Sequence, residues 1–335
     1  MNLVRAELER LGSRRFVQLM LVLLLLALGI TTATTLAGSH RPSVTEVQNA
    51  RAAAAQEIRG MELEYERCVA QLQGQRPADD FGTDKYPTTC SPYDPGQFDR
   101  LPIATDYLDG VFVFAHEAEP LLYFLIAYLV LFGFLVGASF IGADLNSGGV
   151  VNLLLWRPRR LTVLATKLGT LLGALLLLSV VASAVYLGAF WTIGQLAGLP
   201  GTVDGEFWRS LGLLYGRGVV LALIAGATGF ALATLGRHTS AALGTVAAYA
   251  VVWELGARLV MEIVGVERVD QLMLTSHVGA WLNGRVEFWD GADCGPHGCV
   301  GSYEITSGPA LVVLLGVAGV LCAAAFALFR RRDLI

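Results

Sequence analysis

Six apolar runs of membrane-spanning length constrain this chain more than any other feature. They cover residues 16–37, 120–143, 161–191, 211–235, 241–264 and 309–329. Each provides the roughly 20 residues that a helix needs to cross a hydrocarbon core about 30 Å thick. Because a backbone in lipid must satisfy its own hydrogen bonds, and because strict alternation of apolar and polar residues is absent, the runs predict helices and not a barrel. We therefore expect an all-α polytopic membrane protein with six transmembrane helices.

The composition agrees with a chain embedded in a lipid bilayer. Charged residues make up only 16% of the chain, well below the 25% or so of soluble domains. The mean hydropathy is +0.57. The basic residues form short clusters next to the apolar runs, which topology and anionic lipid explain, so no nucleic-acid partner is expected.

The positive charges that flank the runs set the orientation. They are Arg5, Arg10, Arg14, Arg15, Arg157, Arg159, Arg160, Arg237, Arg330, Arg331 and Arg332. With six spans, all of them fall on one face, which the positive-inside rule assigns to the cytoplasm. The segment 38–119 then lies outside, and it carries 14 acidic and 7 basic residues. Both termini are predicted to be cytoplasmic.

The loops complete the predicted organisation. The inner side holds an interfacial helix over 1–15, a loop over 144–160, a turn over 236–240 and a tail over 330–335. The outer side holds a large, partly helical cap region over 38–119 and loops over 192–210 and 265–308. The third run is longer than a span requires, so we expect it to tilt or to extend into the cytoplasm.

A cleavable signal peptide is the alternative for the first run. Arg14 and Arg15 precede an apolar stretch that ends in Thr-Leu-Ala-Gly, and cleavage there would leave five helices. The stretch is longer than the apolar part of an ordinary signal peptide, so a transmembrane helix is the preferred interpretation.

Four cysteines lie in the predicted external segments. An even number outside predicts disulfides, which persist in an oxidising compartment. Four cysteines allow three connectivities; we favour Cys68 with Cys90 and Cys294 with Cys299, because each pair closes a local loop. A metal site that uses His297 between the second pair is the alternative, but no fourth ligand is evident.

The cap region has a helical pattern of its own. Apolar residues recur at spacings of four and three on one face of 47–72, which predicts an amphipathic helix. The proline-rich loop over 76–102 is expected to be irregular. In the third external segment, Trp281, Phe288, Trp289 and Tyr303 are typical of an interfacial aromatic belt.

The loop after the second run carries a specific motif. Asp144 or Ser147 can cap a short helix, residues 150–156 give it an apolar surface, and Pro158 ends it. The stretch from Gly142 to Arg160 resembles the loop of ABC-2 type ABC transporter permeases, the membrane-spanning subunits of ABC exporters. Their pattern is an acidic residue, a Gly-Thr pair, a leucine-rich run, Pro-x-Arg and a basic residue in the next span. Here Asp144 stands where Glu is usual, and Gly148-Gly149 stands where Gly-Thr is usual.

Both ends of the chain are similar to the same family. Residues 2–15 mix leucines with charges, as in a short amphipathic helix before the first span. The chain ends Phe-Arg-Arg-Arg-Asp-Leu-Ile, similar to the aromatic-basic-Asp-Leu endings of such permeases. The resemblance implies that the loop docks onto a separate ATPase, and that the coupling residues are Asp144, Ser147, Gly148, Gly149, Leu153, Trp156, Arg157, Pro158, Arg160 and Lys167.

The resemblance also implies partners for this chain. A phosphate-binding P-loop needs a glycine before its lysine, and neither Lys85 nor Lys167 follows one, so ATP and Mg²⁺ are expected on the partner and not on this chain. Ser147-Gly148-Gly149 resembles the ABC signature, but no Gln follows it. Six helices make half of the usual transporter, so two ATPase subunits and a second permease, identical or related, are expected.

Charges inside the runs are candidates for function. Arg217 in the fourth run and Glu254 and Arg258 in the fifth lie near the outer side, so we predict an Arg–Glu–Arg cluster across two helices. Close helix packing is predicted at three Gly-x-x-x-Gly pairs, which begin at Gly133, Gly169 and Gly212.

Two other classes of function remain open. A membrane-embedded hydrolase would need a nucleophile and a base, and the sequence contains neither His-Glu-x-x-His nor Gly-x-Ser-x-Gly. A regulatory or assembly subunit that senses a ligand through its external cap is the stronger alternative. The neighbouring reading frame distinguishes these alternatives from an exporter. An adjacent ATPase gene favours transport of a hydrophobic or amphipathic substrate across a bacterial inner membrane.

Overall fold

The computed structural model of the chain describes residues 3–73, 89–98, 100–146, 159–289, 294–295, 298–299 and 301–331. The chain divides into two compact units. Unit 1 comprises residues 1–30, 118–188 and 204–335, and unit 2 comprises residues 31–117 and 189–203. The two units are described separately.

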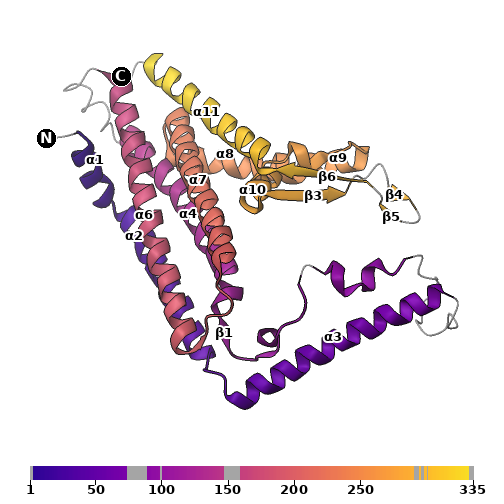
Figure 1. Cartoon of the computed structure of the whole chain (residues 1–335). Helices are drawn as coiled ribbons and strands as arrows, with labels where there is room; N and C mark the ends of the chain where they lie inside the picture. The colour runs from indigo at the N-terminus through magenta and orange to yellow at the C-terminus, as the bar shows by residue number, and fades with distance from the viewer. Residues whose placement is uncertain are drawn as a thin grey trace. The chain divides into compact units, whose positions relative to one another are not determined.

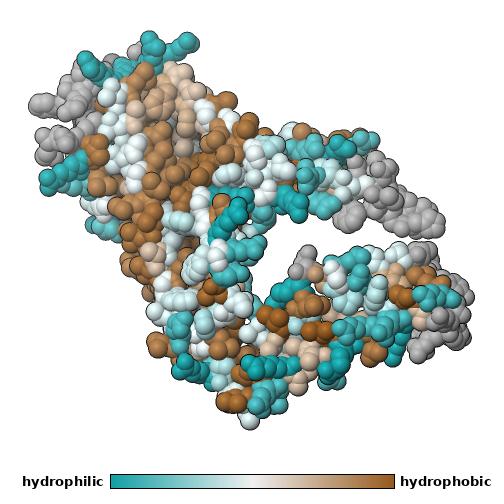
Figure 2. All heavy atoms as spheres, viewed as in Figure 1, coloured by the Kyte–Doolittle hydropathy of each residue, from teal (hydrophilic) through white to brown (hydrophobic). Residues whose placement is uncertain are grey.

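Five long apolar helices provide most of the chain's helical structure. They are α2 (Arg15–Gly38), α4 (Phe114–Asn146), α6 (Arg160–Leu196), α7 (Gly205–Gly236) and α11 (Ser307–Arg331) (Figure 1). Each is long and apolar enough to cross a membrane, and Figure 2 shows hydrophobic surface along their length. These features are those of an all-α polytopic membrane protein. The 37 residues of α6 extend over about 55 Å, which agrees with the excess length of the third run.

The fifth predicted span has a different structure. Its residues are divided among α8 (Thr239–Tyr249), the π-helix η5 (Ala250–Ala257) and α9 (Arg258–Val264), which follow one another directly. The segment is therefore helical throughout, but it is not one of the five long α-helices. A π-helix forms its backbone hydrogen bonds between residues i and i+5 and often marks a functional site. The six-span topology accordingly remains a prediction.

Two helices of unit 1 touch each other through their backbones. A Cβ atom on Gly137 of α4 would lie 2.3 Å from the carbonyl oxygen of Gly226 in α7. A Cβ atom on Gly229 of α7 would lie 2.3 Å from the carbonyl oxygen of Phe134. Only glycine permits this approach, so the packing predicted at the pair that begins with Gly133 is confirmed. At the pairs that begin with Gly169 and Gly212, a Cβ atom added to either glycine would have no atom of the described residues within 4 Å. Close packing at these two pairs is not seen among those residues.

The segment before α11 folds into a small subdomain of unit 1. It contains the 3-10 turn η6 (Val269–Leu272), α10 (Leu274–Asn283) and an antiparallel pair of β3 (Arg285–Trp289) and β6 (Ser302–Thr306). Ala280, Ile305 and Ala310 form its core. Trp281, Phe288 and Tyr303 pack against that core, so these predicted belt residues contribute to a folded region. The side chain of Trp289 lies outside the described residues.

The second of the two predicted cysteine pairs lies on a short hairpin. β4 (Cys294–Gly295) pairs antiparallel with β5 (Gly298–Cys299), and the register sets Cys294 opposite Cys299. Their side chains and His297 lie outside the described residues. The disulfide between this pair therefore stays a prediction.

Unit 2 is built around the helix α3 (Val44–Leu72). Ser43 and Glu46 form a capping box at its start, as the sequence Ser-x-x-Glu favours. The predicted disulfide joins Cys68 of α3 to Cys90. Closing a loop of 22 residues reduces the entropy of the unfolded chain and stabilises the fold by about 3 kcal/mol.

Short elements complete unit 2. The 3-10 turns η2 (Ser91–Tyr93), η3 (Pro95–Gln97) and η4 (Ala104–Tyr107) pack along α3. β1 (Phe112–Val113) and β2 (Gly198–Leu199) form a parallel pair, and a hydrogen bond from the Ala115 amide to the Pro200 carbonyl continues it. Two segments that the sequence predicts to be external, 38–119 and 192–210, are thereby joined.

Candidate functional site

Four charged side chains of unit 1 converge beside the predicted coupling loop. We call Glu7, Arg14, Asp144 and Lys167 the charge cluster. They come from α1 (Leu3–Gly12), from the junction between α1 and α2, from α4 and from α6. Their sequence separations reach 160 residues, so only the tertiary fold assembles them.

Lys167 lies at the centre of the charge cluster. Its ammonium donates to the carboxylate of Glu7 at 2.5 Å and to that of Asp144 at 2.8 Å. The side chains of Lys167 and Glu7 are 2% and 1% exposed, and that of Asp144 is 19% exposed. Buried charges are tolerated only when they are paired and hydrogen-bonded. The two carboxylates supply the partners that a buried ammonium requires.

Arg14 closes the charge cluster on its other side. Its guanidinium lies 2.5 Å from the second carboxylate oxygen of Asp144 and donates to the carbonyl of Ser139 at 2.9 Å. Asp144 therefore bridges Arg14 and Lys167. Arg10 lies 3.3 Å from Glu7 at the exposed edge.

The ring of Phe140 lies against both cations. The Arg14 Cζ atom is 5.0 Å from the ring centroid, and the Lys167 Nζ atom is 4.8 Å from it. Phe140 is completely buried, so these cation–π contacts occur away from solvent, where they are worth about 2 kcal/mol. Phe140 and Asp144 are four residues apart, which places them on one face of α4.

The sequence identifies two members of the charge cluster in advance. Asp144 and Lys167 are predicted coupling residues, and the structure joins them directly. Arg160 is the first residue of α6. The other predicted coupling residues, Ser147, Gly148, Gly149, Leu153, Trp156, Arg157 and Pro158, lie outside the described residues.

Sequence reasoning missed Glu7, Arg14 and Phe140. One signal for Glu7 is present in the sequence, because it lies four residues before the buried Leu11 and therefore on the buried face of α1. An acidic residue on a buried helix face requires a cationic partner. Lys167, one of only two lysines in the chain, is that partner.

The predicted Arg–Glu–Arg cluster does not form. Among the described residues, Arg217, Glu254 and Arg258 are not joined by any ion pair, and each has a separate partner in the segment 265–283. Arg217 donates to the Leu282 carbonyl at 3.2 Å. Arg258 lies 3.0 Å from Asp270 and 2.9 Å from Glu262.

Glu254 is held by hydroxyl and amide donors. The hydroxyls of Tyr249 and Thr275 donate to its two carboxylate oxygens at 2.8 and 2.7 Å, and the Thr275 amide lies 3.2 Å away. In an α-helix, residues five apart point in directions that differ by about 140°. The π-helix brings residues i and i+5 together, which is why Tyr249 and Glu254 meet. The difference from the prediction thus arises from a change in helix register.

Known proteins do not identify the chain. No family model matches it, and no curated protein matches it. The interpretation of the charge cluster therefore depends on its geometry and on the sequence motif that it adjoins.

Proposed function

We propose that this protein is the permease subunit of an ATP-driven ABC exporter of the ABC-2 type, in a bacterial inner membrane with both termini in the cytoplasm. A separate ATPase hydrolyses ATP, and this chain couples that reaction to movement of a hydrophobic or amphipathic substrate. The observation that carries the proposal is the charge cluster. It ties both ends of the predicted coupling loop to the amino-terminal helix.

The position of the charge cluster in the chain supports coupling. Asp144 is the first residue of the predicted loop, and Lys167 lies two turns into the helix that follows the loop. Because the same two residues hold Glu7 and Arg14, a displacement of the loop would move α1 and the start of α2. Gly142 adds a further contact, since its Cβ atom would lie 2.7 Å from the Thr239 amide at the start of α8. Movement of the end of α4 would reach α8 directly.

The partners follow from the same proposal. Two ATPase subunits bind ATP and Mg²⁺, and a second permease, identical or related, completes the transmembrane pathway. The exposed apolar faces of α2 and α6, with Leu25 and Leu177 each 65% exposed, are available to lipid or to that second permease. Few charges lie within the spans, which is compatible with a hydrophobic or amphipathic cargo.

The decisive experiment measures coupling to the ATPase. The permease is co-expressed with each ABC ATPase encoded in the genome that carries its gene, and the purified complex is reconstituted in nanodiscs. We expect charge reversal at both Arg157 and Arg160 to abolish permease-dependent ATP hydrolysis and to reduce co-purification. The same reversal at Arg330 and Arg331, which are also basic and predicted to be cytoplasmic, is the matched control. Unchanged hydrolysis and co-purification in the Arg157 and Arg160 variant would reject the proposal.

A regulatory or assembly subunit is the second candidate. The observation that favours it is the compact unit 2, whose helix α3 is joined to Cys90 by a disulfide. Unit 2 has a polar hollow of about 430 Å³ bordered by Glu46, Asn49, Asp106 and Asp109. A non-transporting subunit would bind its ligand there without moving it. Reconstituted vesicles separate the two candidates, because only a permease produces ATP-dependent loss of cargo from one side of the membrane.

A further inference from the structure

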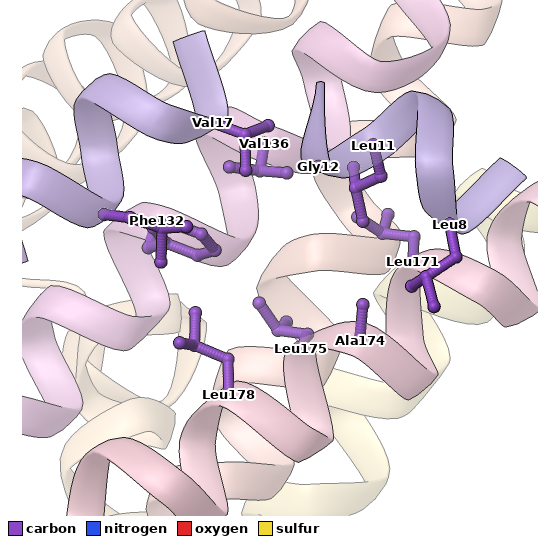
Figure 3. Close-up of a pocket in the computed structure, with 11 residues that line it drawn as sticks. Leu8, Leu11, Gly12, Val17, Phe132, Val136, Leu171, Ala174, Leu175 and Leu178 are labelled. Atoms are coloured by element: carbon purple, nitrogen blue, oxygen red, sulfur yellow. The ribbon is translucent and has the colours of Figure 1, made fainter. Parts of the chain in front are cut away.

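An open apolar pocket lies in unit 1 next to the charge cluster. It has a volume of about 230 Å³ and is bordered by residues of α1, α2, α4 and α6. Figure 3 shows side chains composed only of carbon around it, with Phe132 on one side, Leu171 and Leu8 on the other, and Leu175 and Ala174 between them. A buried water needs two to four polar partners, and these side chains offer none. Hydrocarbon is the chemistry that suits the pocket.

The pocket begins where the charge cluster ends. Leu8 follows Glu7 directly, Val136 precedes Phe140 by one helical turn, and Leu171 follows Lys167 by one turn. The pocket therefore lies about one helical turn, about 5 Å along the helices, beyond the charge cluster.

The pocket is accessible from the surface that faces lipid. Leu8 borders the pocket and is still 50% exposed, so the pocket opens beside α1. Its neighbours on the two flanking helices are exposed leucines, with Leu19 of α2 54% exposed and Leu177 of α6 65% exposed. In the proposed membrane arrangement, an apolar pocket that opens among such residues is within reach of acyl chains.

Cationic residues stand at the same level as the opening. Arg10 has a half-exposed side chain, and the exposed Arg15 begins α2 two residues before the pocket residue Val17. Basic residues at the end of a span attract lipid phosphate. Arginines at this level of the helices can attract the phosphate of a phospholipid whose acyl chain enters the apolar pocket.

We propose that this pocket binds one acyl chain of a bilayer phospholipid from the cytoplasmic leaflet, with the lipid phosphate beside Arg15. The assignment to that leaflet rests on the orientation in the proposed function. Because α1 forms one wall of the pocket and carries Glu7, the bound chain supports the helix on which the charge cluster depends. The lipid is a structural partner of the coupling apparatus and not its cargo.

The test uses the full chain in nanodiscs that contain a phospholipid with a photoreactive diazirine in its acyl chain. After illumination, peptide mass spectrometry maps the labelled residues. We expect residues 8–12 and 171–178 to carry more label than the exposed face of α11. The amount of label on these residues should saturate as the concentration of photoreactive lipid rises. Even labelling of all lipid-facing segments, or protection of α1 by a second permease copy, would overturn the proposal.

Two matched variants sharpen the test. Ala174→Phe fills the pocket and should reduce labelling of α1 several-fold. Ala184→Phe makes the same change at an exposed position of α6 and should leave labelling of α1 unchanged. Equal labelling of α1 in the two variants counts against the pocket.

If Ala174→Phe fails to fold, the labelling pattern of the wild-type protein alone still tests the pocket. A third variant tests the contact with the lipid headgroup. Arg15→Gln should weaken labelling by an anionic lipid more than labelling by a zwitterionic one. Equal loss with both lipids would reject the phosphate contact. Labelling requires no ATPase, so the two proposals can fail separately. If the pocket is labelled but charge reversal at Arg157 and Arg160 leaves ATP hydrolysis unchanged, the proposed function is rejected and the lipid site is retained.

Discussion

The ammonium of Lys167 lies 2.5 Å from the carboxylate of Glu7, although 160 residues separate them. Both side chains are buried, with exposures of 2% and 1%. This pair joins the amino-terminal helix to the third long helix. It links α1 directly to the helix that follows the predicted coupling loop.

Removing Lys167 should destabilise the fold strongly. In Lys167→Met, the carboxylates of Glu7 and Asp144 would remain buried without that cation, and we expect the free energy of unfolding to fall by about 3–5 kcal/mol. Thermal unfolding in nanodiscs measures the loss. Arg5→Met is the control, because its ion pair with Glu9 is exposed and is worth about 0–1 kcal/mol. Glu7→Gln combined with Lys167→Met should cost less than the sum of the two single changes, and strict additivity would contradict the direct coupling.

Replacing Glu254 should impair folding or transport but not docking of the ATPase. Glu254→Ala leaves the hydroxyls of Tyr249 and Thr275 without their acceptor; because both hydrogen bonds are only part-buried, we expect a cost of about 1 kcal/mol for each. Glu262→Ala is the control, since that carboxylate is 50% exposed and its loss should change stability by about 0.5 kcal/mol or less. Unfolding temperature, substrate export and co-purification with the ATPase are measured together. Normal expression and export in Glu254→Ala would refute this role.

Adding one methyl group at Gly137 should separate α4 from α7. The Cβ atom of Gly137→Ala would meet the backbone of Gly226 at 2.3 Å, and overpacking against backbone costs about 1–3 kcal/mol. Gly216→Ala makes the same change in α7 with no atom within 4 Å among the described residues. There it should be neutral or stabilising, because Ala favours a helix over Gly by about 1 kcal/mol. Similar unfolding temperatures for the two variants would contradict the backbone contact.

The capping box of α3 should make that end of the helix sensitive to acid. The hydrogen bond from the Ser43 amide is the main reason that the pKa of Glu46 falls from 4.5 to about 2, with smaller contributions from the Ser43 hydroxyl and from His40. A lowered pKa in the folded state means that the stabilisation is present above about pH 4.5 and is lost as the pH falls towards 2. Hydrogen-exchange protection of the first turn of α3 should decline over that range. Glu46→Gln cannot ionise at this position, and its protection should not vary with pH in the same interval.

The long helices were predictable because their residues leave few alternatives. An apolar run of about 20 residues can satisfy its backbone in lipid only as a helix, and five of the six runs are long α-helices in the structure. The exact first and last residues of the helices were harder to predict. α4 begins at Phe114, six residues before the predicted start at Pro120. The proline therefore lies inside the helix, where it removes one backbone hydrogen bond without ending the helix.

The charge cluster was only half predictable. Asp144 and Lys167 flank a recognisable loop motif, whereas Glu7 and Arg14 reach them through contacts between residues 160 and 130 positions apart. No local spacing encodes such pairs. The partners of Glu254 were hidden for another reason, since the prediction assumed α-helical geometry where the backbone forms a π-helix.

The glycine contacts between α4 and α7 limit how the bundle can move. Where two backbones touch without intervening side chains, there is no soft layer to absorb a shift of one helix against the other. A displacement applied near Asp144 would move α4 and α7 together as one rigid body. Any hinge in this protein must then lie where side chains separate the helices, and the apolar pocket beneath α1 is such a place.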